Sequence, residues 1–179
     1  MPGDIAAVRA LRHSLDAVGF LVAIVALIAV AMLLIGALRR RGGRGGRTVA
    51  SGLAVLGACV ALAGIAELTL FGTQGLGAGP RLELDPVLGA RGWSGIAWRP
   101  VIDNVTLFVP LGAMLAALWC RRSWLIVLAG ATIVSLGVEG FQWALPTGRI
   151  ANSADVLANA AGSLLGILLA RVLGACRDR

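Results

Sequence analysis

A group of polar side chains between residues 137 and 162 has the types and spacing of a binding or catalytic site. Carboxylates and amides bind ammonium and hydroxyl groups, and the forked guanidinium of arginine binds phosphate through paired hydrogen bonds. A carboxylate close to a second carboxylate can also act as a general base near neutral pH. The group consists of Glu139, Gln142, Arg149, Asp155 and Asn159.

The spacing of these residues predicts that they face one another. Glu139 and Gln142 are three residues apart and Asp155 and Asn159 are four apart, so each pair shares one face of a helix. The sequence LPTGR between the two pairs is typical of a tight turn, which would make the two helices antiparallel neighbours. We therefore expect both polar faces to meet beneath Arg149.

The composition determines which elements must position this group. The chain has 179 residues, 58% of them hydrophobic, and a mean hydropathy of +0.88, which predicts an integral membrane protein. Apolar runs long enough to cross the membrane predict an all-α bundle of five transmembrane helices in a single domain. These runs cover residues 17–38, 49–71, 101–119, 124–145 and 153–172, with the last three in the segment 101–172.

The arginines predict the orientation of the bundle. The short, arginine-rich link at residues 39–47 is expected in the cytoplasm, as is the C-terminus, with the N-terminus outside. The Gly-rich link at residues 72–100 and the turn before residue 152 then face outward. This arrangement gives a net charge of +9 inside and −2 outside, so the basicity is explained by orientation. No nucleic acid is expected as a partner, because the basic link contains no aromatic residue for stacking bases.

Other polar residues are expected at the same outer level: Asn104 is assigned to the ligand-binding group, whereas Glu67, Arg99 and Asp103 have weaker claims to function. Asn104 and Asp103 open the third run, and Glu67 closes the second. Glu67 could simply pair with Arg99, and Asp103 could cap its helix. Thr132, Ser135 and Ser163 are assigned to contacts between helices, where hydrogen bonds are common and contribute about 0.6 kcal/mol.

The cysteines and the histidine do not indicate a metal centre or a disulfide. Cys59 lies within the second run, Cys120 and Cys176 lie at cytoplasmic ends, and His13 is remote from all three. No cofactor is predicted. A divalent cation held by the carboxylates stays open as an alternative.

The motifs NVTLFVPLG, GVEGFQ and TGRIANSADVLANAAGSLLG together resemble the VanZ-like family of small bacterial membrane proteins, over residues 104–166. The resemblance implies family polar positions at Asn104, Glu139, Gln142, Arg149, Asp155 and Asn159, and structural positions at Pro110, Gly112, Gly162 and Gly166. It also implies a link to glycopeptide resistance, chiefly to teicoplanin, and a place in cell-envelope biology.

The first function hypothesis is a site for a polar head group at the outer leaflet of the bacterial cytoplasmic membrane. Its ligand would be a membrane lipid, a lipid-linked cell-wall precursor or a lipoglycopeptide. Arg149, assisted by Arg99, would hold a phosphate or carboxylate, while the acids and amides bind amine or hydroxyl groups.

Two alternatives belong to other classes. The first is an integral-membrane enzyme acting on a lipid head group, with Glu139 or Asp155 as general base. It lacks an activated nucleophile, because the chain contains no lysine and His13 is remote. The second alternative is a small transporter or structural membrane protein, although the polar groups stop at one leaflet. The sequence leaves the oligomeric state open.

Overall fold

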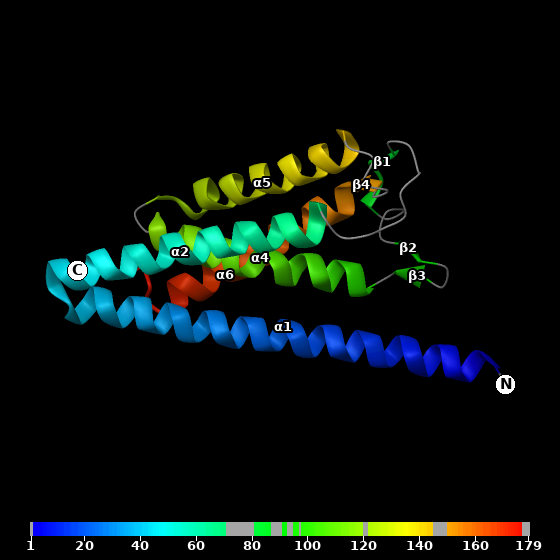
Figure 1. Ribbon diagram of the computed structural model, residues 1–179, viewed down its shortest axis with the longest axis horizontal. Coiled ribbons are helices and arrows are strands. Elements are labelled where there is room, and N and C mark those ends of the chain that lie inside the picture. Colours follow the sequence, from blue (N-terminus) through cyan, green and yellow to red (C-terminus); the bar gives the residue numbers. More distant parts are fainter. Residues whose placement is uncertain are drawn as a thin grey trace.

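The computed structural model describes residues 2–70, 81–86, 91–92, 95–96, 98–119, 122–144 and 150–176. The described part of the chain forms a bundle of helices with short strands at one end (Figure 1). The helices are α1 (Pro2–Arg41), α2 (Gly43–Leu70), α4 (Trp98–Leu118), α5 (Trp124–Ala144) and α6 (Ser153–Val172). All five are long and apolar enough to cross a membrane, which confirms the predicted fold class and makes this a multi-pass membrane protein.

The N-terminal helix begins much earlier than hydropathy predicts. α1 starts at Pro2 and not at residue 17, and the segment Val22–Arg41 in its second half is long and apolar enough to span a membrane. No glycine or proline occurs between Gly3 and Gly19, so nothing in this stretch stops the helix. By contrast, α4, α5 and α6 agree with their predicted runs to within three residues at each end.

α1 and α2 are joined by a turn made of glycines. Gly43 has a φ of 54°, in the left-handed region that favours glycine, and α2 begins there instead of at residue 49. A Cβ on Gly42 would collide with the backbone of Gly46 and with the carbonyl oxygen of Leu38. The two helices therefore pack closely from the turn onward.

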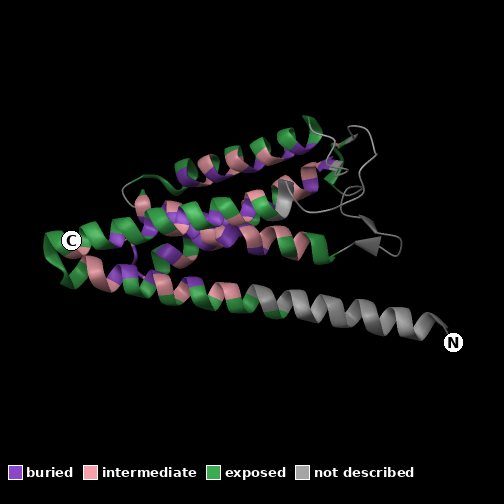
Figure 2. Cartoon of the chain, in the orientation of Figure 1, coloured by how far each residue is buried: buried purple, intermediate pink, exposed green. Residues whose placement is uncertain are grey.

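α4 is the central helix and packs most closely against α6. Its buried residues include Phe108, Val109 and Leu111, and Figure 2 shows buried residues in the second half of α4 and on the sides of other helices that face the middle of the bundle. The helices approach closely where glycines remove side chains. A Cβ on Gly162 would overlap the carbonyl oxygen of Val105, one on Gly166 that of Val109, and one on Gly112 that of Ser163. The small face of α6 thus meets another helix, as the sequence predicted.

Tryptophans mark where the bundle crosses the membrane interface. Trp98 and Trp143 are exposed at one end of α4 and α5, and Trp119 and Trp124 are exposed at the other. The helical rise places the two levels about 30 Å apart, which matches the hydrocarbon core of a bilayer. Exposed tryptophans at both levels form the aromatic belts typical of membrane proteins.

Backbone carbonyls at the ends of α4 and α6 are joined by an arginine from α1. Arg39 donates to the carbonyl oxygen of Ala117 at 2.6 Å and to that of Ala175 at 3.0 Å. At the same end, Arg171 donates to the carbonyl oxygen of Arg122 at 3.2 Å. Cations are favoured at helix C-termini, where carbonyls carry partial negative charge, so these arginines also stabilise the fold.

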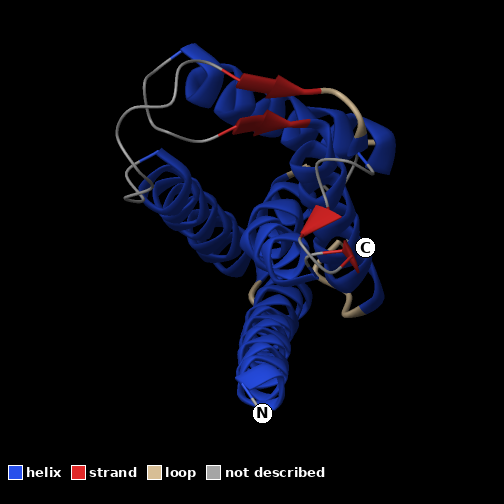
Figure 3. Cartoon of the chain, turned by 90° about the vertical axis from the view of Figure 1, so that its right-hand side faces the viewer, coloured by secondary structure: helices blue, strands red, loops and turns tan. Residues whose placement is uncertain are grey.

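The opposite end carries strands that the sequence did not predict. β1 (Arg81–Glu83) pairs in parallel with β4 (Ile150–Asn152), and β2 (Arg91–Gly92) pairs with β3 (Gly95–Ile96) in antiparallel fashion. Figure 3 shows these strands lying across that end of the bundle. Within the link at 72–100, residues Arg81–Glu83 thus form a strand whose partner, β4, lies directly before α6 in the chain.

Candidate functional site

α5 presents one buried face whose character changes along its length. Its buried residues are Val127, Ala131, Ser135, Glu139 and Gln142. The two nearest Trp124 are apolar, and the three nearest Trp143 are polar. Glu139 is only 8% exposed and Gln142 only 4%, so both side chains point into the protein and not toward lipid. By helical rise Glu139 lies about 6 Å and Ser135 about 12 Å below the level of Trp143.

Glu139 connects α5 to the beginning of α6. Its Oε2 accepts a hydrogen bond of 2.7 Å from the backbone N–H of Asn152. The Asn152 side chain in turn caps α6, because its Oδ1 accepts from the backbone N–H of Ala154 at 2.9 Å. The charge of Glu139 is therefore held against the N-terminal end of α6, where a carboxylate is favoured.

Asp155 connects α6 to α4. Its Oδ1 accepts a hydrogen bond of 2.6 Å from Nδ2 of Asn104, and both residues are partly buried. Asp155 lies in the first turn of α6, so it shares that helix end with Glu139. Two carboxylates from different helices thus lie at the N-terminal end of α6.

Asn159 lies one turn deeper and forms the floor of the group. It is 2% exposed, its Nδ2 donates to Oγ of Ser135 at 2.9 Å, and its backbone oxygen accepts from Oγ of Ser163. Its side-chain Oδ1 is buried and has no hydrogen-bond partner among the described residues. Buried polar atoms are almost always paired, so this oxygen is suited to a donor from a water or a ligand. We call Asn104, Glu139, Gln142, Asp155 and Asn159 the polar cluster.

Comparison with known protein families matches residues 20–174, most of the chain, to VanZ/LLP1. The chain belongs to the VanZ/LLP1 family. No curated protein and no solved structure matches it significantly. The match is longer than the motif resemblance at 104–166 and includes α2 and the membrane span of α1. Membership links this VanZ/LLP1 protein, in general terms, to cell-envelope and resistance functions.

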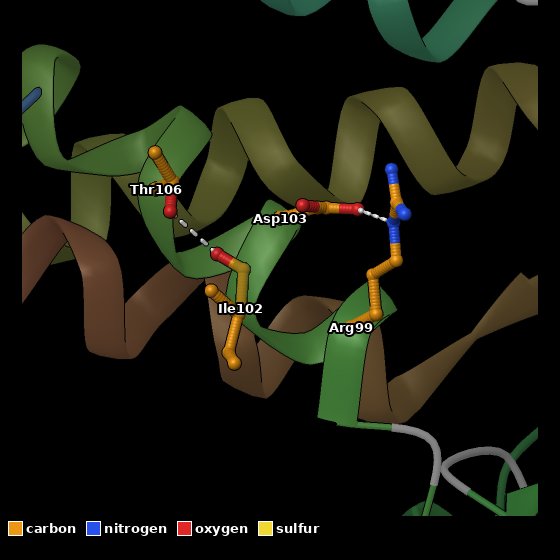
Figure 4. Close-up of polar contacts among 4 residues, drawn as sticks. All are labelled: Arg99, Ile102, Asp103 and Thr106. Atoms are coloured by element: carbon orange, nitrogen blue, oxygen red, sulfur yellow. Dashed lines mark hydrogen bonds and ion pairs between the residues drawn. The ribbon is translucent and has the colours of Figure 1, made fainter. Parts of the chain in front are cut away.

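The weaker sequence candidates lie outside the polar cluster of this VanZ/LLP1 protein. Asp103 points along the surface of α4 toward Arg99, with 3.6 Å between its Oδ2 and the arginine Nε (Figure 4). Both side chains are about half exposed, and such ion pairs contribute little to stability. Glu67 is exposed at the end of α2. Arg99 therefore pairs with Asp103, and the alternative pairing with Glu67 is not formed.

Hydroxyl groups of threonine bond within their own helices and do not reach the cluster. Thr106 Oγ1 donates to the carbonyl oxygen of Ile102 at 2.7 Å (Figure 4), and Thr132 Oγ1 donates to that of Leu128 at 2.9 Å. Arg149 and the predicted turn at 145–149 lie outside the described residues. The family polar position at Arg149, which directly precedes β4 in the chain, therefore stays a prediction from the sequence.

The segment 81–86 was missed as a neighbour of the cluster. In the pairing of β1 with β4, Glu83 lies opposite Asn152, and Ser153 Oγ donates to the carbonyl oxygen of Leu84 at 2.9 Å. Asp85 follows one residue later and is exposed. No local signal in the sequence indicates this contact, because a parallel pairing joins residues that are far apart in the chain.

The chemistry available here is recognition by hydrogen bonds and charge. Each described carboxylate of the cluster accepts from an N–H group, which holds it in place. No set of three histidine, cysteine or acidic side chains close enough to hold a metal ion occurs among the described residues. A divalent cation therefore remains an expectation from the sequence alone.

Proposed function

We propose that this VanZ/LLP1 protein binds the polar head group of a membrane lipid or lipid-linked cell-wall precursor at the outer leaflet of the bacterial cytoplasmic membrane. The observation that carries the proposal is the buried, unpartnered Oδ1 of Asn159 beneath two carboxylates. An acceptor left without a donor costs free energy in a packed interior, roughly 1–3 kcal/mol. A ligand donor would recover that cost.

The charge of the described cluster favours a particular end of the ligand. Glu139 and Asp155 are the ionisable groups of the polar cluster, and its other described members are amides. Such a set binds ammonium or hydroxyl groups of a head group. Arg149 would hold the phosphate of the same ligand, because its guanidinium fork matches phosphate oxygens.

The depth of the cluster also fits a lipid. Glu139 lies about one helical turn below Trp143, which is the level at which head groups meet hydrocarbon. A head group could therefore enter while its acyl or prenyl chain stays along the exposed apolar faces of the bundle. Binding of a lipid-linked precursor would mask it, and masking would give protection against teicoplanin-type glycopeptides.

Lipid binding can be tested with the purified parent protein by native mass spectrometry. The protein in detergent is titrated with phosphatidylethanolamine, phosphatidylglycerol, phosphatidylcholine and a polyprenyl-diphosphate-linked sugar. We expect saturable retention of an amine- or sugar-bearing lipid, at least tenfold above phosphatidylcholine. Equal, weak retention of all four would contradict the proposal and leave the cluster as contacts between helices.

The outer-leaflet assignment predicts a labelling pattern in intact cells. In a background lacking Cys59, Cys120 and Cys176, a membrane-impermeant maleimide should label Leu84→Cys, which is exposed beside β1. It should label Gly45→Cys only after permeabilisation. Gly45 is suitable because nothing lies within 4 Å of a Cβ there. The reverse pattern would move the cluster to the cytoplasmic leaflet.

A further inference from the structure

We propose that the turn between α1 and α2 carries a second lipid site, specific for the phosphate groups of anionic phospholipids, at the opposite leaflet from the polar cluster. Four arginines around the turn form this surface, which we call the arginine ridge: Arg40, Arg41, Arg44 and Arg47. The inference is independent of the function proposed above, because it concerns the other end of the bundle.

The side chains of the arginine ridge are exposed and free to bind a ligand. Among the described residues, none of the four forms an ion pair with an acid. Arg39 behaves differently, since its guanidinium is held by the carbonyl oxygens of Ala117 and Ala175. One arginine of the turn thus stabilises the fold, whereas the other four form no ion pair with a described acidic side chain.

The turn keeps these four arginines close together. Gly42 and Gly46 let the helices touch, and Gly43 reverses the chain within one residue. Arg44 and Arg47 are three residues apart and share one face of α2. Guanidinium groups concentrated in this way match phosphate oxygens, whose charge and geometry they complement.

The surroundings favour a lipid over a soluble phosphate. Arg39 joins the end of α1 to Ala117, two residues before Trp119, so the ridge lies near the tryptophan level of that end. Below it, Leu34 of α1 and Val49 and Leu53 of α2 are exposed apolar side chains that acyl chains would cover. Basic surfaces at this position attract anionic lipids.

The ridge can be tested by fluorescence quenching in vesicles. Trp93, Trp98 and Trp143 are changed to phenylalanine, which leaves Trp119 and Trp124 as reporters near the ridge. The full chain is reconstituted in phosphatidylcholine containing a small, equal fraction of either brominated phosphatidylglycerol or brominated phosphatidylcholine. We expect at least twofold stronger quenching by the brominated anionic lipid, and a loss of that excess at high salt.

Variants and competitors decide between the possible outcomes. Changing all four ridge arginines to glutamine should abolish the excess quenching, whereas Arg99→Gln at the other end should leave it unchanged. Changing the four arginines to lysine keeps their positive charge, so part of the excess quenching should remain. That remaining excess would show that a protein with four changes in the ridge still folds. Equal quenching by both brominated lipids would overturn the proposal. Displacement by millimolar glycerol phosphate or by a short RNA would also overturn it, because the site would then bind a soluble anion.

Discussion

Replacing Gly162 or Gly166 by alanine is expected to destabilise the protein strongly, because each glycine lies against the backbone of α4. The new Cβ would overlap the carbonyl oxygen of Val105 or of Val109. A backbone atom cannot move aside as a flexible side chain can, so α4 and α6 must separate. Overpacking of this kind costs about 1 to 3 kcal/mol, and leucine at either position should cost more.

The measurement is thermal unfolding of each variant in detergent, compared with a matched glycine that faces open space. Gly52 of α2 is exposed and has nothing within 4 Å of a Cβ. Gly52→Ala should therefore melt at or above the parent temperature, since alanine favours helix over glycine by about 1 kcal/mol. If Gly162→Ala and Gly166→Ala melted like Gly52→Ala, the close packing of α4 on α6 would be wrong.

Removing one carboxylate charge from the polar cluster is expected to abolish lipid retention without unfolding the protein. In Glu139→Gln the side chain keeps an oxygen that can accept from the Asn152 N–H, and Asp155→Asn keeps one for Asn104. Stability should therefore change by no more than about 1 kcal/mol. The charge that would hold a cationic head group is lost, so retention should fall at least tenfold. Arg149→Ala should have the same effect through the lost phosphate contact.

The appropriate control is a charge removed from the same end of the bundle but outside the cluster. Asp103→Asn removes a carboxylate that is half exposed and paired with Arg99 on the surface of α4. It should retain lipid like the parent in native mass spectra, and it should preserve any resistance phenotype that the parent confers. If Glu139→Gln and Asp155→Asn behaved like Asp103→Asn, the cluster would serve only to join helices.

Hydropathy and spacing are enough to place most of the helices and one face of the site. Burial of apolar side chains depends on local composition, so the runs at 124–145 and 153–172 predict α5 and α6 almost to the residue. The three-residue spacing of Glu139 and Gln142 likewise places both on the buried face of α5. The small residues of α6 indicate a close helix contact for the same local reason.

Tertiary structure decides which partners these groups meet. Hydrogen bonds such as Asn104 to Asp155 join different helices, and their formation depends on how α4 packs on α6. The pairing of β1 with β4 brings Leu84 to Ser153 across 69 positions of the chain. No periodicity along the sequence encodes such contacts, because they arise only when distant segments are packed together. The buried oxygen of Asn159 belongs to the same class, since its lack of a partner is a property of the assembled bundle.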